Sequence, residues 1–184
     1  MKKMFISLLL AFALLLTAGL ALAEDFPALA NFQAMTLDGK VFTQDDLAKA
    51  DVTVLNIWSV TCPPCIAEMP DLAAFAKTLP DNVQVLTVCL DAGLVSNNEV
   101  QKFLTERAGF EGQTLIGGDG DFQTVMSQVL YTPTTLFVDA QGRSVGSTVI
   151  GGQQDLAAAY TASINEVLEA SGKPLLNVAT ASDM

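Results

Sequence analysis

The chain has 184 residues, with twenty acidic and nine basic side chains, a net charge of −11 and no histidine. The acidic balance argues against nucleic acid or anionic lipid as a partner, because neither phosphate surface attracts a negative protein. Without histidine, imidazole metal ligands and Cys/His or Ser/His catalytic pairs are excluded. Chemistry is left to thiols, carboxylates and the backbone, and we expect no metal and no organic cofactor.

The first 23 residues have the pattern of an export signal. Two lysines precede a long apolar run that ends in Ala21-Leu22-Ala23, a small-x-small cleavage pattern, and acidic chain follows directly. We predict a signal peptide over residues 1–23 and an exported, periplasmic or cell-surface protein. An alternative stays open, in which residues 4–23 are an uncleaved membrane anchor, since about 20 apolar residues also span a bilayer.

Removal of this segment leaves about 160 residues, the usual size of one domain. We predict one domain over residues 24–172 and a flexible C-terminal tail over residues 173–184. Seven basic residues then face twenty acidic ones, because Lys2 and Lys3 leave with the signal.

The domain is predicted to open with a β-hairpin. Asp38-Gly39 is a strong two-residue turn signal, and it separates the strand-like residues 32–37 and 40–42. Thr43 is a suitable N-cap for a brief helix after the second strand.

Residues 52–58 form an apolar, largely β-branched run that predicts a central buried strand. Residues 66–77 have helical periodicity, and Pro70 predicts a kink because it lacks a backbone donor. Cys62 and Cys65 therefore lie at a strand-to-helix junction.

The rest of the chain continues the alternation of strands and helices. Further strands are predicted at residues 83–90, 114–116, 134–138 and 146–150, the last two as a hairpin. Helices are predicted after the capping box that runs from Ser96 to Glu99, and at residues 121–130 and 155–170. This order predicts an α/β fold with a central, mixed but mainly parallel sheet flanked by helices.

The Cys-x-x-Cys spacing at this junction predicts a redox pair. Free backbone donors and the helix dipole at a helix N-terminus favour a thiolate, which is the nucleophile in disulfide exchange. We assign Cys62 as the attacking thiol and Cys65 as the thiol that resolves the mixed disulfide. Pro63 and Pro64 cost little in the first turn, where backbone donors have no helical partner.

Two other roles are open to the pair. Half of a zinc site would need two further ligands, and the remaining cysteine, Cys89, lies in a predicted buried strand. A purely structural disulfide between Cys62 and Cys65 would close a very short loop and so stabilise little.

Residues 56–70 (Asn-Ile-Trp-Ser-Val-Thr-Cys-Pro-Pro-Cys-Ile-Ala-Glu-Met-Pro) resemble the active-site segment of thioredoxin-like proteins of the TlpA/ResA group, and Tyr131-Thr132-Pro133 resembles the loop that carries their cis-proline. The resemblance covers about residues 30–170. It implies a thioredoxin-like fold with an N-terminal β-hairpin. It also implies dithiol/disulfide exchange outside the cytoplasm with client protein thiols or disulfides, such as those of apocytochrome c, and a membrane electron donor of the CcdA or DsbD type.

The resemblance also assigns roles to single residues. Pro133 would be the cis-proline opposite the cysteines, where the Thr132 backbone lets a client strand dock, although it could be an ordinary loop proline. Glu68 would exchange protons with the thiols, unless it is only an acid near a helix N-terminus. The expected substrate-binding residues are Trp58, Pro63, Pro64 and Thr132, with core packing as the alternative for Trp58.

The sequence departs from the pattern at three positions. Asn56 stands where many thioredoxins carry a buried aspartate, so Glu68 would act alone in proton exchange. Thr61 stands where a tryptophan commonly precedes the first cysteine. Cys89 is interpreted as a small buried hydrophobe, with a third redox thiol as the alternative.

We therefore predict an exported thiol:disulfide oxidoreductase that acts as a monomeric disulfide reductase. No inserted helical domain of DsbA type is visible between residues 90 and 131, and no isomerase-type dimerisation domain precedes the hairpin. One alternative is a thiol peroxidase, because residues 59–62 (Ser-Val-Thr-Cys) loosely resemble the peroxiredoxin Thr-x-x-Cys. The other is a noncatalytic thioredoxin-fold binding module.

Overall fold

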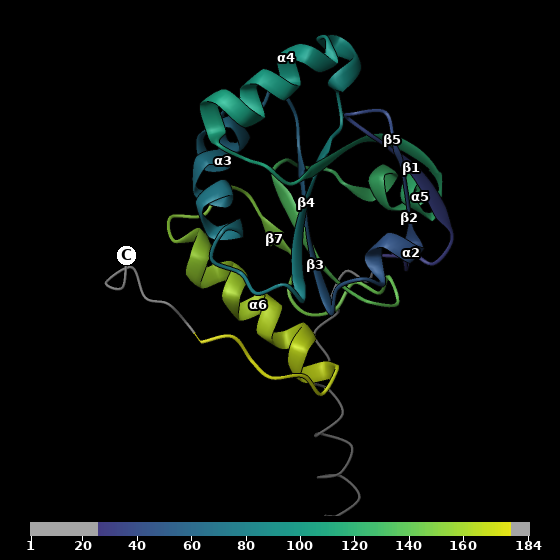
Figure 1. The fold of residues 1–184 in the computed structure, drawn as a ribbon, viewed down its shortest axis with the longest axis vertical. Coiled ribbons are helices and arrows are strands. Elements are labelled where there is room, and N and C mark those ends of the chain that lie inside the picture. The colour runs from purple at the N-terminus through teal and green to yellow at the C-terminus, as the bar shows by residue number, and fades with distance from the viewer. Residues whose placement is uncertain (1–25, 178–184) are drawn as a thin grey trace, which may run out of the picture.

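The computed structural model describes residues 26–177, in which one seven-stranded sheet carries helices on both faces (Figure 1). The strands are β1 (Phe32–Thr36), β2 (Val41–Thr43), β3 (Val52–Trp58), β4 (Val83–Cys89), β5 (Gln113–Gly120), β6 (Thr134–Asp139) and β7 (Val149–Ile150). The helices are α2 (Gln44–Leu47), α3 (Pro63–Ala76), α4 (Asn97–Lys102), α5 (Asp121–Gln128) and α6 (Leu156–Ala170), with a 3-10 turn η1 (Ala92–Leu94) and a π-helical turn η2 (Phe103–Ala108).

The N-terminal hairpin is confirmed. β1 and β2 pair antiparallel, and Gly39 takes the positive φ of 82° that this tight turn needs. Thr43 begins α2 with a capping box. Its hydroxyl accepts a hydrogen bond from a backbone N–H of the first turn, and the Asp46 carboxylate accepts one from the Thr43 N–H.

The predicted central strand is also confirmed. All seven residues of β3 are buried, and the strand lies between β4, to which it is parallel, and β6, to which it is antiparallel. A strand that is buried on both faces has no solvent side, which explains why its sequence is almost continuously apolar. The end of β3 leads directly into the loop before α3, and this loop carries the cysteines.

The sheet is mixed, but the expectation that it is mainly parallel is wrong. Over residues 26–177, two pairings are parallel, β3–β4 and β4–β5, and four are antiparallel, β1–β2, β1–β5, β3–β6 and β6–β7. A hairpin at each edge of the sheet, β1–β2 and β6–β7, adds antiparallel strands around a parallel centre. The strand order is β2-β1-β5-β4-β3-β6-β7.

β5 is longer than the predicted residues 114–116. It continues through a glycine-rich segment to Gly120 and pairs along the whole of β1. A Cβ atom on Gly118 would lie 2.5 Å from the Gln33 carbonyl oxygen, so the missing side chain is what lets the two strands approach. Because glycine normally weakens a strand, the pattern did not reveal this extension.

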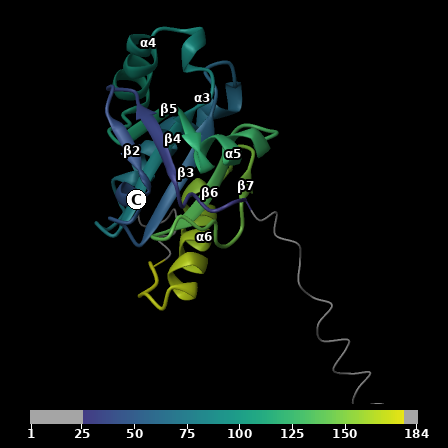
Figure 2. The same cartoon turned by 90° about the vertical axis from the view of Figure 1, so that its right-hand side faces the viewer.

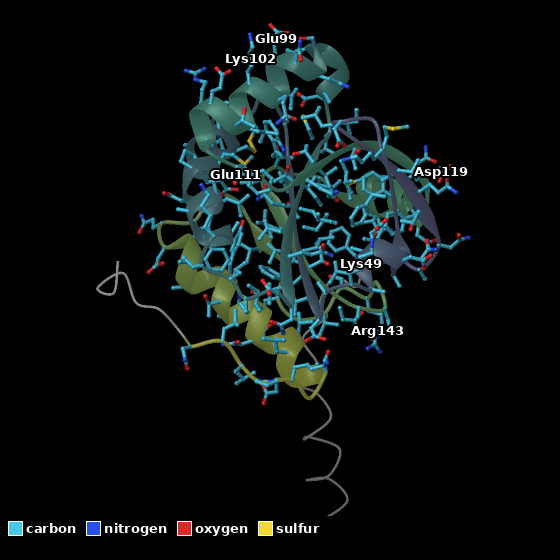
Figure 3. All side chains as sticks on the ribbon, viewed as in Figure 1. Lys49, Glu99, Lys102, Glu111, Asp119 and Arg143 are labelled. Atoms are coloured by element: carbon cyan, nitrogen blue, oxygen red, sulfur yellow. A yellow bond between two sulfur atoms is a disulfide. The ribbon has the colours of Figure 1, made fainter. Side chains whose placement is uncertain are left out.

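The helices cover the two faces unequally. α3 and α6 pack together on one face, and Figure 2 looks onto the other face, which carries α5. Tyr160 of α6 packs edge-on against Phe75 of α3 and Phe137 of β6, with ring centroids 5.9 and 5.5 Å apart. Such pairs contribute about 0.5–1.5 kcal/mol each beyond their buried area. The charged side chains of Glu99, Lys102 and Asp119 point outward (Figure 3).

The predicted signal or anchor at residues 1–23 lies outside the described residues, as do residues 178–184. Residues 173–177 of the predicted tail lie within the described part of the chain, and Leu176 contacts the domain. The Asn165 amide donates to the Leu176 carbonyl at 3.0 Å and accepts from the Leu176 N–H at 2.8 Å, and the Leu176 side chain packs on the core. Between residues 26 and 177, the helices are too short or too polar to span a bilayer.

Candidate active site

The two cysteines begin helix α3 and are joined by a disulfide. Cys62 is the N-cap, and the Cys65 N–H donates to its sulfur at 3.3 Å. Pro63 and Pro64 occupy the first two helical positions and are exposed, as their missing backbone donors allow. Cys62 is 9% exposed and Cys65 is fully buried, so an approaching thiol or disulfide reaches the sulfur of Cys62 first.

The loop before β6 lies against the first cysteine. The Thr132–Pro133 peptide bond is cis, and the Cys62 sulfur lies 3.5 Å from the Thr132 carbonyl oxygen, seventy residues away in sequence. Pro133 is buried, and its carbonyl accepts from the Gly151 N–H at 2.8 Å. The structure therefore brings together Cys62, Thr132 and Pro133, as the resemblance implied.

Glu68 lies on α3, three residues after Cys65, and is only 5% exposed. Its Oε1 accepts from the Asn56 amide nitrogen at 3.0 Å, while Oε2 has no hydrogen-bond partner among the described residues. Burial raises the pKa of Glu68 to about 7; the Asn56 hydrogen bond opposes this rise and the charge of Asp71 adds to it. A carboxyl group that titrates near neutral pH can both accept and return a proton.

Two further residues belong to this buried polar cluster, and sequence reasoning missed them. The Asn56 amide nitrogen also lies 3.0 Å from the Thr135 hydroxyl and 3.3 Å from the Tyr160 hydroxyl, and these two hydroxyls are 2.6 Å apart. Burial raises the pKa of Tyr160 to about 12, so its phenol keeps its proton. Thr135 faces Asn56 because the β3–β6 register pairs them, which no local motif reveals.

Trp58 does not offer a surface to a client. It is fully buried, and its ring packs against Phe103 of η2 with centroids 5.6 Å apart. The predicted substrate contact is therefore wrong, because β3 is the central strand and its last residue still faces the core.

Cys89 ends β4 and is buried, with its sulfur 3.7 Å from an Asp91 carboxylate oxygen. Burial raises the pKa of Cys89 to about 12, so very little thiolate forms at neutral pH. In the described part of the chain, no three acidic or cysteine side chains gather in a way that could hold a metal ion.

We expect Cys89→Ala to leave the rate of disulfide exchange unchanged and to cost about 1 kcal/mol of stability, because a buried sulfur is lost from the core. Insulin reduction and urea denaturation measure the two quantities. A loss of exchange with unchanged stability would instead make Cys89 a redox thiol.

The Redoxin family matches residues 22–166, which is well over half of the chain. No curated protein matches the sequence. Among solved structures, the chain is similar to dsbF of Mycobacterium tuberculosis, determined in mixed oxidized and reduced forms. Identity is 26%, the TM-score is 0.60, and the match covers 77% of this chain and 98% of dsbF.

Two more structures give the same result. The exposed lipoprotein thioredoxin Etrx1 of Streptococcus pneumoniae is 28% identical, with a TM-score of 0.52, and the match covers 72% of this chain and 97% of that one. A secreted disulfide oxidoreductase of M. tuberculosis, homologous to E. coli DsbE, is 25% identical with a TM-score of 0.52, covering 66% of this chain and 84% of that one. The thioredoxin-like fold is thus confirmed.

The family match and these neighbours agree with the site, in which a reachable sulfur, its partner and a cis-proline loop meet at one end of the central strand. The chain belongs to the Redoxin family, and it is a thiol:disulfide oxidoreductase of thioredoxin-like fold with the redox pair Cys62 and Cys65.

Proposed function

We propose that the protein is an exported disulfide reductase, which takes electrons from a membrane donor of the CcdA or DsbD type and gives them to disulfides of client proteins. The observation that carries this proposal is the asymmetry of the pair: the Cys62 side chain is 9% exposed beside the Thr132–Pro133 loop, and Cys65 is fully buried one turn before Glu68. The apolar signal-like segment supports export. Apocytochrome c is one client that the family resemblance suggests.

The proposed reaction assigns a step to each of these residues. The Cys62 thiolate attacks one sulfur of a client disulfide, a Cys62–client bond forms, and the other client sulfur leaves and takes up a proton. Glu68 then accepts the proton of the Cys65 thiol, and the resulting thiolate attacks the Cys62 sulfur. The Cys62–client bond breaks, and the second client sulfur leaves and takes up a proton, so that the client departs as a dithiol and the protein keeps the Cys62–Cys65 disulfide. Two electrons have passed to the client.

The cis-proline loop supplies the place where the client binds. The Thr132 carbonyl oxygen lies 3.5 Å from the Cys62 sulfur, and the exposed Tyr131 precedes it. Backbone groups at this position can pair with an extended client segment in the manner of an added strand. Pro63 and Pro64 are exposed beside Cys62 and form the other side of the contact.

We expect the reduction potential of the Cys62/Cys65 couple to lie near or below about −250 mV, in the range of thioredoxin and not of DsbA. Equilibration of residues 24–184 with dithiothreitol or glutathione buffers, followed by alkylation and mass spectrometry, measures it. Cys62→Ser is the control, because it cannot form the disulfide. A potential near about −120 mV would make the protein an oxidant and overturn the reductase assignment.

A further inference from the structure

The loop that leads into Cys62, residues 59–61, is held by one carboxylate that follows strand β4. Asp91 follows β4, and its Oδ2 accepts from the Ser59 hydroxyl at 2.6 Å and the Thr61 hydroxyl at 3.3 Å, while Oδ1 accepts from the Val60 N–H at 2.8 Å. All three residues of the loop thus donate to Asp91. The mechanism above makes no use of this carboxylate.

The fastened loop in turn fixes the N-terminus of α3. The Thr61 N–H donates to the Ser59 hydroxyl at 3.1 Å, and the Cys62 N–H donates to the Ser59 carbonyl at 3.2 Å. Thr61 is exposed, and Val60 is the apolar side chain of this turn that packs against the core. The position of the Cys62 backbone therefore depends on the packing of Val60 and on hydrogen bonds that converge on Asp91.

Asp91 carries its negative charge in this site. Burial raises the pKa of Asp91, but the hydrogen bonds from Ser59, Val60 and Thr61 outweigh it and leave the pKa below its ordinary value. The titratable neighbour in contact is Cys89 on β4, which stays a neutral thiol, and the first turn of α3 contains no acidic residue. Within residues 26–177, no lysine or arginine forms an ion pair with Asp91.

We propose that Asp91 is a positioning residue for Cys62, which both fastens the attacking loop and keeps the couple strongly reducing through its charge. A negative charge beside the loop disfavours the Cys62 thiolate. Because a less stable thiolate makes the reduced form less stable, the potential falls and the protein gives up its electrons more readily. The inference deepens the proposed function and rests on it.

The charge and the hydrogen bonds can be separated by substitution. Asp91→Asn removes the charge and keeps a side chain that can still accept from Val60, whereas Ser59→Ala removes the shortest hydrogen bond and keeps the charge. Asp91→Ser is a second charge-removing variant if Asp91→Asn does not fold. Asp81→Asn is the matched control, because Asp81 is an exposed acid before β4, at the opposite end of that strand from Asp91.

The readouts are the equilibrium constant for reduction of the disulfide by glutathione and the pKa of Cys62 from its thiolate absorbance. We expect Asp91→Asn to raise the constant about three- to tenfold, a rise in potential of about 15 to 30 mV, and to lower the pKa of Cys62. We expect Ser59→Ala and Asp81→Asn not to raise the constant. An unchanged constant in Asp91→Asn, or an equal rise in Ser59→Ala, would overturn the inference.

These measurements test the role of Asp91 and the reductase function separately. The absolute potential of the unchanged protein tests whether it is a reductase. The difference between Asp91→Asn and the unchanged protein tests the role of Asp91, whatever the absolute value is.

Discussion

The Cys65→Ser protein is expected to remain covalently joined to its clients. Cys62 is the reachable sulfur and would still attack a client disulfide, but the second thiol that releases the client is missing. Reduced Cys65→Ser is incubated with insulin or with an extract of exported proteins. Non-reducing electrophoresis should then show adducts, and a reductant should cleave them. Mass spectrometry of the adducts would then identify the clients.

Cys62→Ser is the matched control for this trap. Its remaining active-site thiol, Cys65, is fully buried, so we expect no adducts and no insulin reduction above the uncatalysed rate. Adducts with Cys62→Ser but not with Cys65→Ser would reverse the assigned order of the two thiols. Full client binding and cellular effect in Cys62→Ser would support a noncatalytic binding module instead.

Glu68→Gln should slow the release step. The amide cannot accept the Cys65 proton, and loss of a general base typically costs a factor of about 10²–10⁴. In the unchanged protein, the release rate should rise with pH through about 7 as Glu68 ionises, and this step in the pH profile should vanish in Glu68→Gln. Rapid-mixing fluorescence with a preformed mixed disulfide measures the step. A Glu68→Gln profile identical to that of the unchanged protein would remove Glu68 from the mechanism.

The same substitution should also change stability in a pH-dependent way. Below pH 4.5 the carboxyl is protonated in both the folded and the unfolded chain. Between pH 4.5 and about 7 only the unfolded chain ionises it, so folding loses stability as pH rises. The loss is complete above pH 7 and amounts to roughly 3 kcal/mol.

Glu68→Gln should therefore be more stable, relative to the unchanged oxidised protein, at pH 8 than at pH 5, by roughly this amount. Urea denaturation of both proteins at both pH values gives the double difference, which is the change with pH in the difference between their free energies of unfolding. Glu169→Gln, which changes an exposed glutamate on α6, is the control and should show a far smaller one. An equally small double difference for Glu68→Gln would mean that the carboxyl ionises freely in the folded protein.

Much of the site could be predicted from local patterns. The cysteine pair, the strand before it and the capped helices are specified by residues within a few positions of each other, so hydrophobic periodicity, turn residues and capping boxes reveal them. The N-terminal hairpin at Asp38-Gly39 and the strand at residues 52–58 are predictable for this reason, and the structure contains both. The cis peptide bond at Thr132–Pro133 was expected from the family resemblance and not from local chemistry.

Other features depend on which distant segments become neighbours, and no local pattern encodes them. Thr135 and Tyr160 reach Asn56 from positions 79 and 104 residues away, through the β3–β6 register and the packing of α6. Asp91 meets the loop before Cys62 because parallel β3 and β4 end at the same edge of the sheet. The chain thus encodes its reactive thiols locally, whereas the burial and charge that tune them arise from strand pairing and helix packing across the folded domain.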